Sequence, residues 1–166
     1  TTAEVVTCTI GSSGLSGRGE CVPYARYGES VAGVLAAIED MRGAVEDGIG
    51  REELARVMPA GAARNALDCA LWDLEAKLSG VPTWQVVNAA APQKLVTAFT
   101  LSLGEPEAMQ RQAAQEAGRP LLKVKVGTAD DAARIRAVRA GAPESAIILD
   151  ANEGWTPENL AYHFAL

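Results

Sequence analysis

Two lysines, Lys123 and Lys125, lie two residues apart in one short apolar stretch, and Asp150 and Asn152 follow the next such stretch. In an extended strand, side chains two residues apart point to the same face, so the two ammonium groups should be neighbours. A metal cation held by Asp150 would acidify the C–H bond beside a substrate carboxylate. A lysine near that cation and a second lysine can act as a base near neutral pH. The pattern therefore indicates removal of a proton from carbon.

Each part of this pattern also has a simpler explanation. Alternating lysine and valine in residues 121–126 is common on antiparallel sheets with one face in water. Asp150 would equally fit a turn or helix cap before Asn152, Glu153 and Gly154. The surrounding elements favour the chemical interpretation, because a parallel strand between two helices is covered on one face. The lysine face must then point into a barrel or cleft.

The second half of the chain alternates predicted strands with predicted helices. Strands are expected at residues 95–102, 121–126 and 147–150, and helices at 106–117, at 129–140 and from Pro157 onward. This alternation predicts parallel strands joined by right-handed crossovers. Ligands bind at the carboxyl ends of such strands, and Asp150 ends the last of them.

The first half of the chain has a different pattern. Strands are expected at residues 4–10 and 19–22 with a turn at 11–14, and helices at 31–45, 51–58 and 67–78. Two strands followed by three helices predict an α+β unit. The change of pattern near Pro92 predicts two domains, residues 1–91 and 92–166.

Composition excludes several classes of protein. The chain has 166 residues, 48% of them hydrophobic, and a formal net charge of -6, so a globular core is expected and the basic surface needed for nucleic-acid binding is missing. No apolar run is long enough to span a membrane. Cys8, Cys21 and Cys69 lack metal-site spacing and form an odd set, which favours a soluble protein of the reducing cytoplasm. The single histidine, His163, is expected to have an ordinary packing or surface role.

The ordered set of motifs resembles the enolase superfamily, and specifically its muconate-cycloisomerase-like subgroup. Lys-x-Lys on the second barrel strand and Asp-x-Asn on the third are signatures of that subgroup, and residues 17–20 and 66–74 also look like the family. The resemblance covers essentially the whole chain. It implies an α+β capping domain followed by the first three β/α units of a TIM-type barrel.

The resemblance also implies roles for the four polar residues. Lys125 would be the general acid/base on one face of the substrate α-carbon, and Lys123 would support it electrostatically. Asp150 would be the first ligand of Mg²⁺, with Asn152 in the outer part of that site.

Residues 21–29 resemble the specificity loop of dipeptide epimerases that act on Ala-Glu. Tyr24, Arg26 and Tyr27 are therefore expected to close over a charged dipeptide, although packing within the loop or contact with solvent would also fit them. Residues 97–101 resemble the first barrel strand of the same enzymes, which adds Thr100 to the predicted substrate-binding residues.

The function implied is Mg²⁺-dependent epimerisation of a dipeptide such as L-Ala-D/L-Glu by 1,1-proton transfer, in an enzyme that forms homo-oligomers. A muconate cycloisomerase or an o-succinylbenzoate synthase would share the lysines and Asp150, and a non-catalytic α/β binding module is the alternative from another class. The family carries an opening strand, two more acidic ligands and a second lysine that residues 1–166 lack. We therefore expect both ends to be trimmed and these 166 residues alone to be inactive.

Overall fold

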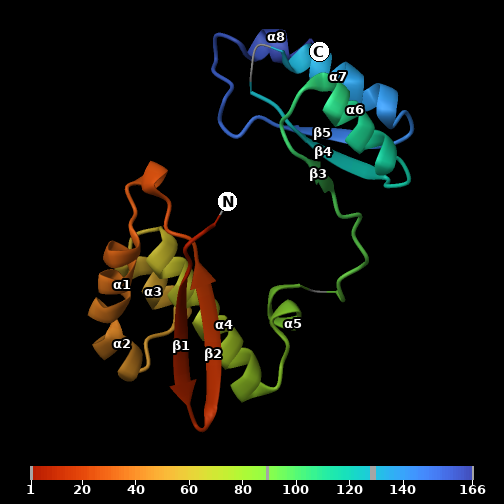
Figure 1. Ribbon diagram of the computed structural model, residues 1–166. Helices are drawn as coiled ribbons and strands as arrows, with labels where there is room; N and C mark the ends of the chain where they lie inside the picture. The colour runs from red at the N-terminus through yellow and green to blue at the C-terminus, as the bar shows by residue number, and fades with distance from the viewer. Residues whose placement is uncertain (1, 89, 128–129, 166) are drawn as a thin grey trace. The chain divides into compact units, whose positions relative to one another are not determined.

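The chain begins with an antiparallel hairpin of β1 (Val6–Ser12) and β2 (Leu15–Cys21), shown in Figure 1. The computed structural model describes residues 2–88, 90–127 and 130–165. Ser13 and Gly14 form a two-residue turn with φ angles of 51° and 79°. Two positive φ angles match the twist of paired strands, so the pairing continues up to the turn. The predicted four-residue turn at 11–14 is therefore too long.

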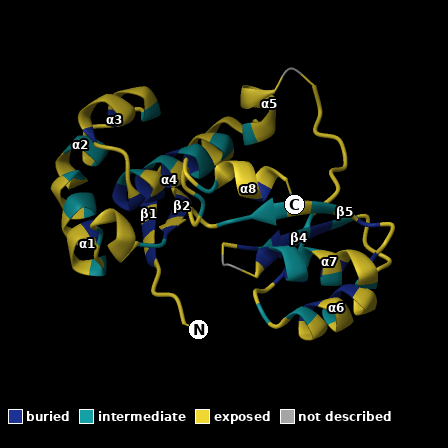
Figure 2. Cartoon of the chain, turned by 90° about the horizontal axis from the view of Figure 1, so that it is seen from above, coloured by how far each residue is buried: buried dark blue, intermediate teal, exposed yellow. Residues whose placement is uncertain are grey.

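Four helices follow the hairpin: α1 (Val31–Asp40), α2 (Arg42–Glu46), α3 (Arg51–Val57) and α4 (Ala62–Ser79). The buried residues of α1, α3 and α4 share one apolar core with Val6, Cys8 and Ile10 of β1. In Figure 2 the buried side of α4 lies along this hairpin. The short helix α5 (Thr83–Val87) comes after α4 and was not predicted. This first compact unit spans Thr1–Pro92.

The contact between β2 and α4 is a contact between two backbones. A Cβ atom placed on Gly19 would lie 1.9 Å from the carbonyl oxygen of Ala66, and one on Gly17 would lie 2.1 Å from that of Ala70. Ala66 and Ala70 are fully buried. Small residues on both elements therefore fix how closely the helix approaches the strand.

Two predicted helix boundaries in this unit are wrong. The helix expected at 31–45 is interrupted at Met41, whose N–H donates to the carbonyl oxygen of Ile38, three residues back, at 3.2 Å. This tighter bond ends the regular helical pattern. The helix expected from residue 67 begins instead at Ala62, because the Glu29 carboxylate accepts the Ala62 N–H at 2.6 Å and caps the helix from a distant loop.

The second compact unit, Gln93–Leu166, contains a three-stranded parallel sheet. Its strands are β3 (Phe99–Leu101), β4 (Leu121–Lys125) and β5 (Ala146–Asp150), in that order, and its helices are α6 (Pro106–Gln115), α7 (Asp131–Gly141) and α8 (Leu160–Phe164). Leu122 and Val124 are buried in one core with residues of α6 and α7. Figure 1 shows these two helices on one side of the sheet. The predicted fold class, an α+β unit followed by three parallel β/α units, is confirmed.

The elements of this unit are shorter than predicted at two places. The strand expected at 95–102 is reduced to the three residues of β3, and Leu95 before it is 88% exposed. The last helix starts at Leu160 rather than Pro157, because the Asn159 side chain accepts the Thr156 N–H at 2.8 Å and holds a turn there. Ala129, the expected first residue of the helix before β5, lies outside the described residues. No helix within the described ranges is long and apolar enough to cross a membrane.

The close approach of β2 and α4 leads to a stability prediction. Gly19→Ala should lower the free energy of unfolding by about 3 kcal/mol, because the new methyl group can be accommodated only if strand and helix separate. Gly11→Ala is the matched control in β1, since its Cβ would be 3.8 Å from the nearest atom, and it should change the same quantity by less than about 0.5 kcal/mol. Urea unfolding followed by circular dichroism measures both. Equal effects would contradict the backbone contact.

Candidate active site

Lys123 and Lys125 lie on the face of β4 opposite the residues buried beneath α6 and α7. The parallel register places Lys125 beside Asp150, the last residue of β5. Both lysine Nζ atoms contact the same carboxylate oxygen of Asp150, at 2.8 Å for Lys123 and 2.6 Å for Lys125. The structure thus brings together the three residues that the sequence predicts for proton transfer.

These contacts determine the ionisation of Asp150. Hydrogen bonds from the Lys123 and Lys125 ammonium groups, and from the Asn152 N–H at 2.9 Å, hold the pKa of this carboxyl well below its usual range. All three donors stabilise the charged form. The side chain keeps 25% of its surface exposed, so it is accessible to a ligand.

Asn152 lies in a turn directly after β5. Its φ angle is 47° and that of Glu153 is 63°, and the turn is closed by the Gly154 N–H donating to the Ala151 carbonyl oxygen at 2.8 Å. This conformation is tolerated by asparagine better than by most residues. It directs the side-chain oxygen of Asn152 to Lys125 Nζ at 2.6 Å. Asn152 therefore contacts the lysine itself.

Thr100 is the remaining predicted site residue of the second unit. It lies in β3, exposed, and pairs with Lys123 in the sheet register. Neighbouring residues in register share one face of a sheet. Thr100 therefore lies on the lysine face.

Tyr24, Arg26 and Tyr27 belong to the first unit, in and beside the short 3₁₀ helix η1 (Ala25–Tyr27). The rings of Tyr24 and Tyr27 meet edge to face with centroids 6.1 Å apart, and both side chains are mostly exposed. Gly28, with φ of 78°, ends the helix. These residues form one loop whose aromatic rings are accessible.

Glu29 holds this loop in place and is not among the residues predicted for the site. Its carboxylate accepts the Tyr24 N–H at 3.1 Å as well as the Ala62 N–H at the start of α4. The bonds from Ala62 and Tyr24 lower the pKa of Glu29 below its usual value. A carboxylate at the end of a predicted specificity loop was the available signal, but its partner Ala62 is 33 residues away.

The oxygen atoms of Asp150 are of the type that Mg²⁺ prefers. Among the residues that the structure describes, no group of three or more histidine, cysteine, aspartate or glutamate side chains could hold a metal ion. Asp150 therefore fits the role of one carboxylate ligand, and within the described ranges it has no second and third ligand of these types beside it.

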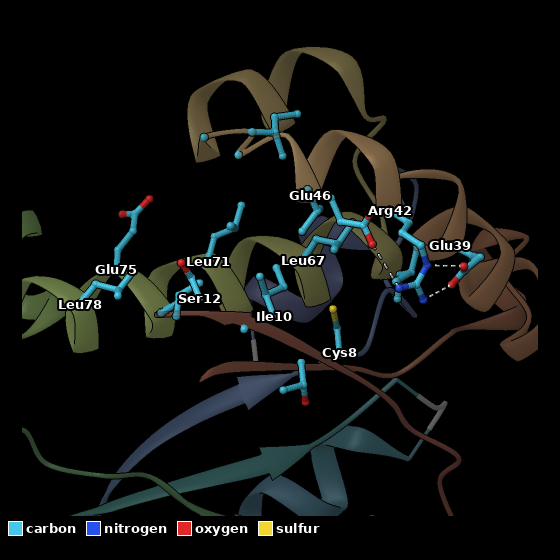
Figure 3. A pocket seen from close by; sticks show the side chains of 18 residues that line it. Cys8, Ile10, Ser12, Glu39, Arg42, Glu46, Leu67, Leu71, Glu75 and Leu78 are labelled. Atoms are coloured by element: carbon cyan, nitrogen blue, oxygen red, sulfur yellow. Dashed lines mark hydrogen bonds and ion pairs between the residues drawn. The ribbon is translucent and has the colours of Figure 1, made fainter. Parts of the chain in front are cut away.

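A separate groove of about 650 Å³ lies in the first unit, between β1, the α1–α2 segment and α4. Figure 3 shows its apolar floor, which includes Ile10, Leu67 and Leu71, and the ion pairs of Arg42 with Glu39 and Glu46 at one side. None of the predicted site residues lines this groove. The described groove is therefore not where the lysine chemistry lies.

Paired lysines and a carboxylate at the carboxyl edge of parallel strands, after an α+β unit, match the arrangement that the sequence predicts for the enolase superfamily. Residues 1–87 match the family model described as the N-terminal domain of mandelate racemase / muconate lactonizing enzyme. The chain belongs to this family of the enolase superfamily, and the predicted resemblance is confirmed.

Relatives of known activity include the L-Ala-D/L-Glu epimerase of Escherichia coli K12, which is 44% identical over 161 residues covering 96% of this chain and 50% of that protein. A crystal structure from Agrobacterium tumefaciens, an enolase family member with homology to dipeptide epimerases, contains sodium and L-Ala-L-Glu. The protein in that structure is 58% identical in sequence to this chain. The two structures match with a TM-score of 0.91 over 98% of this chain and 50% of the Agrobacterium tumefaciens chain.

A second crystal structure is of a dipeptide epimerase from Enterococcus faecalis V583, complexed with Mg and L-Leu-L-Tyr. It is 31% identical in sequence to this chain and matches it with a TM-score of 0.80, over 95% of this chain and 48% of the epimerase chain. These homologues are isomerases of the enolase superfamily. The chain spans about half the length of the curated relatives it matches.

The ion-paired cluster predicts an unusual titration for Asp150. Its carboxyl should remain ionised at about pH 3, where a free aspartate with a pKa of about 3.9 is mostly protonated. Because the folded-state pKa is lowered, the stabilisation from Asp150 is complete above the unfolded pKa and is lost as the pH falls toward the folded one. The stability deficit of Asp150→Asn should accordingly be largest at neutral pH and shrink in acid.

Carboxyl ¹³C NMR titration measures this behaviour directly. Lys123→Met should raise the pKa of Asp150 toward its ordinary value, and the double variant Lys123→Met with Lys125→Met should raise it further. An Asp150 that titrates like free aspartate in the unsubstituted chain would contradict the hydrogen-bonded cluster.

Proposed function

We propose that the natural polypeptide carrying this chain is a dipeptide epimerase that inverts the α-carbon of the glutamate residue in L-Ala-D/L-Glu by 1,1-proton transfer. The observation that carries the proposal is the Lys123, Lys125 and Asp150 cluster at the carboxyl edge of the parallel sheet. The similarity to an epimerase of that specificity and to a structure holding L-Ala-L-Glu supports the choice of substrate.

Lys125 is the general acid/base for one face of the substrate carbon. Its Nζ is held between Asp150 and Asn152, both at 2.6 Å, so its position is fixed by two acceptors. Lys123, on the same face, contributes positive charge near the carbon that loses the proton. When bound with Asp150 as one of its ligands, Mg²⁺ would supply further positive charge to stabilise the resulting anion.

The remaining predicted residues are proposed to select the substrate. Tyr24, Arg26 and Tyr27 form an accessible loop with two aromatic rings and one cation, which suits a dipeptide that bears carboxylates. Thr100 and Asn152 provide polar groups on the lysine face. Substrate selection is thus shared between the loop in residues 1–91 and polar groups in residues 92–166, and proton transfer lies in residues 92–166.

The cell compartment and assembly are also proposals. Cys8, Cys21 and Cys69 are all free thiols, which suits the reducing cytoplasm. A homo-oligomer is proposed for the full-length enzyme by resemblance.

A muconate cycloisomerase or o-succinylbenzoate synthase would share the lysine cluster. Assays of dipeptides beside the substrates of those enzymes separate the three candidate activities.

Deuterium exchange at the substrate α-carbon tests the role of Lys125. In heavy water the natural polypeptide should incorporate deuterium at the glutamate α-carbon of both L-Ala-L-Glu and L-Ala-D-Glu, and Lys125→Ala should reduce that rate by about 10²–10⁴-fold for the epimer whose α-proton Lys125 removes. Lys125→Arg keeps the positive charge and should be equally impaired. NMR of each dipeptide measures the exchange, and exchange retained from both epimers in both variants would remove Lys125 from its role.

The 166-residue chain alone should not epimerise the dipeptide. The described residues provide one carboxylate for Mg²⁺, and that carboxylate is paired with two lysines. Isothermal calorimetry should therefore show no binding of Mg²⁺ at concentrations of about 1 mM, near the weak limit of protein sites for such cations. Magnesium-dependent epimerisation by the purified chain would contradict this prediction.

A further inference from the structure

In the second unit, a buried cluster of ionisable side chains is formed by residues of α7 and α8. Asp131 is the first residue of α7 and is fully buried, and Arg134 and His163 are each 8% exposed. The Asp131 carboxylate lies 3.9 Å from an Arg134 nitrogen and 3.9 Å from His163 Nδ1. Burial of a carboxylate costs free energy unless it is paired and hydrogen-bonded, so this cluster requires an explanation.

Each member of the cluster holds the loop that follows a different strand. Asp131 accepts the N–H of Gly127, after β4, at 2.8 Å. Arg134 donates from Nε to the carbonyl oxygen of Gly104, after β3, at 2.8 Å. His163 stacks on Trp155, after β5, with ring centroids 4.9 Å apart and an interplanar angle of 15°.

The loop held by Asp131 in turn packs against the turn that contains Asn152. A Cβ atom on Gly127 would lie 3.0 Å from the Ala151 carbonyl oxygen, and one on Gly154 would lie 3.2 Å from Gly127 Cα. The two loops are therefore in backbone contact. Gly127 is two residues after Lys125.

A continuous set of contacts thus leads from Asp131 to the lysine cluster. It passes from the carboxylate to the Gly127 N–H, from Gly127 to Ala151 and Gly154, and through that turn to the Asn152 oxygen on Lys125. The Val126 N–H donates to the Asp150 carbonyl oxygen at 3.1 Å and ties the same strands together. Displacement of Gly127 would therefore be transmitted to the turn that carries Asn152, one of the two acceptors of Lys125.

We propose that Asp131 is a positioning residue for proton transfer, which acts through Gly127 on the turn that orients Lys125. The expected effect of Asp131 on turnover rests on the proposed epimerase function. The expected effect of Asp131 on the position of Gly127 does not. Misplacement of a reacting group by about 1 Å can cost about 10²-fold in rate, so a remote carboxylate can have a large effect on turnover.

Hydrogen exchange resolved to single amides tests the structural part in the natural polypeptide. Asp131→Ala should speed exchange of the Gly127 and Gly154 amides at least about tenfold, because it removes the acceptor that holds the loop. Asp131→Asn retains an acceptor oxygen and should be closer to the unsubstituted protein. Asp130→Ala is the matched control, since the Asp130 side chain is 75% exposed and makes no capping hydrogen bond, although it lies 4.0 Å from an Arg134 nitrogen. Because this contact does not involve the Asp131 carboxylate, Asp130→Ala should leave both amides unchanged.

Steady-state kinetics with L-Ala-L-Glu test the catalytic part. Asp131→Ala should lower kcat by at least about tenfold with little change in KM, Asp131→Asn should recover part of the loss, and Asp130→Ala should behave like the unsubstituted enzyme. If Asp131→Ala does not fold, Asp131→Glu, which keeps the charge but moves the carboxylate, should show the same changes.

Two results would overturn the proposal. One is unchanged exchange of the Gly127 amide in folded Asp131→Ala or, if that variant does not fold, in folded Asp131→Glu. The other is unchanged kcat in a variant whose Gly127 amide has become exposed. Absence of epimerase activity from the unsubstituted polypeptide would instead refute the proposed function, and the exchange measurement would still decide whether Asp131 holds the loop.

Discussion

The parallel pairing of β4 with β5 is the constraint on which the candidate site depends. Its register sets Lys125 beside Asp150, and the two-residue period of the strand brings Lys123 to the same carboxylate. A slip of β4 by one residue would turn both lysines toward the core under α6 and α7, where Leu122 and Val124 are now fully buried. The apolar residues of β4 thus fix the position of its polar ones.

This dependence explains how much of the site could be predicted from the sequence. Alternation of Lys123 and Lys125 with Leu122, Val124 and Val126 is a local pattern, and it predicts correctly which face is buried. The contact of both lysines with one oxygen of Asp150 depends on how two strands align, which no local pattern contains. The positive φ angles that turn Asn152 toward Lys125 likewise became visible only in the structure.

The first unit shows the same limit at its helix boundaries. The apolar spacing in α4 predicted a helix, but its first turn depends on Glu29, whose carboxylate reaches Ala62 from 33 residues away. Because Glu29 also binds the Tyr24 N–H, one carboxylate fixes both the start of α4 and the loop carrying the predicted substrate-binding residues. Folding of α4 and placement of that loop are therefore coupled, and rules for isolated helices could not anticipate either bond.

The charges of the lysine cluster suit the proposed removal of a proton from carbon. Two ammonium groups share one carboxylate, so the cluster has one excess positive charge when both lysines are protonated. Loss of an α-proton places negative charge on the substrate, and fixed positive charge lowers the free energy of that state most effectively where water is scarce. Lys123 and Lys125 retain only 36% and 28% exposure of their side chains before any substrate is bound. The sheet therefore holds both lysine nitrogens in place before the reaction, and the excess positive charge arises when Lys125 accepts the proton, so the protein need not reorganise when the anion forms.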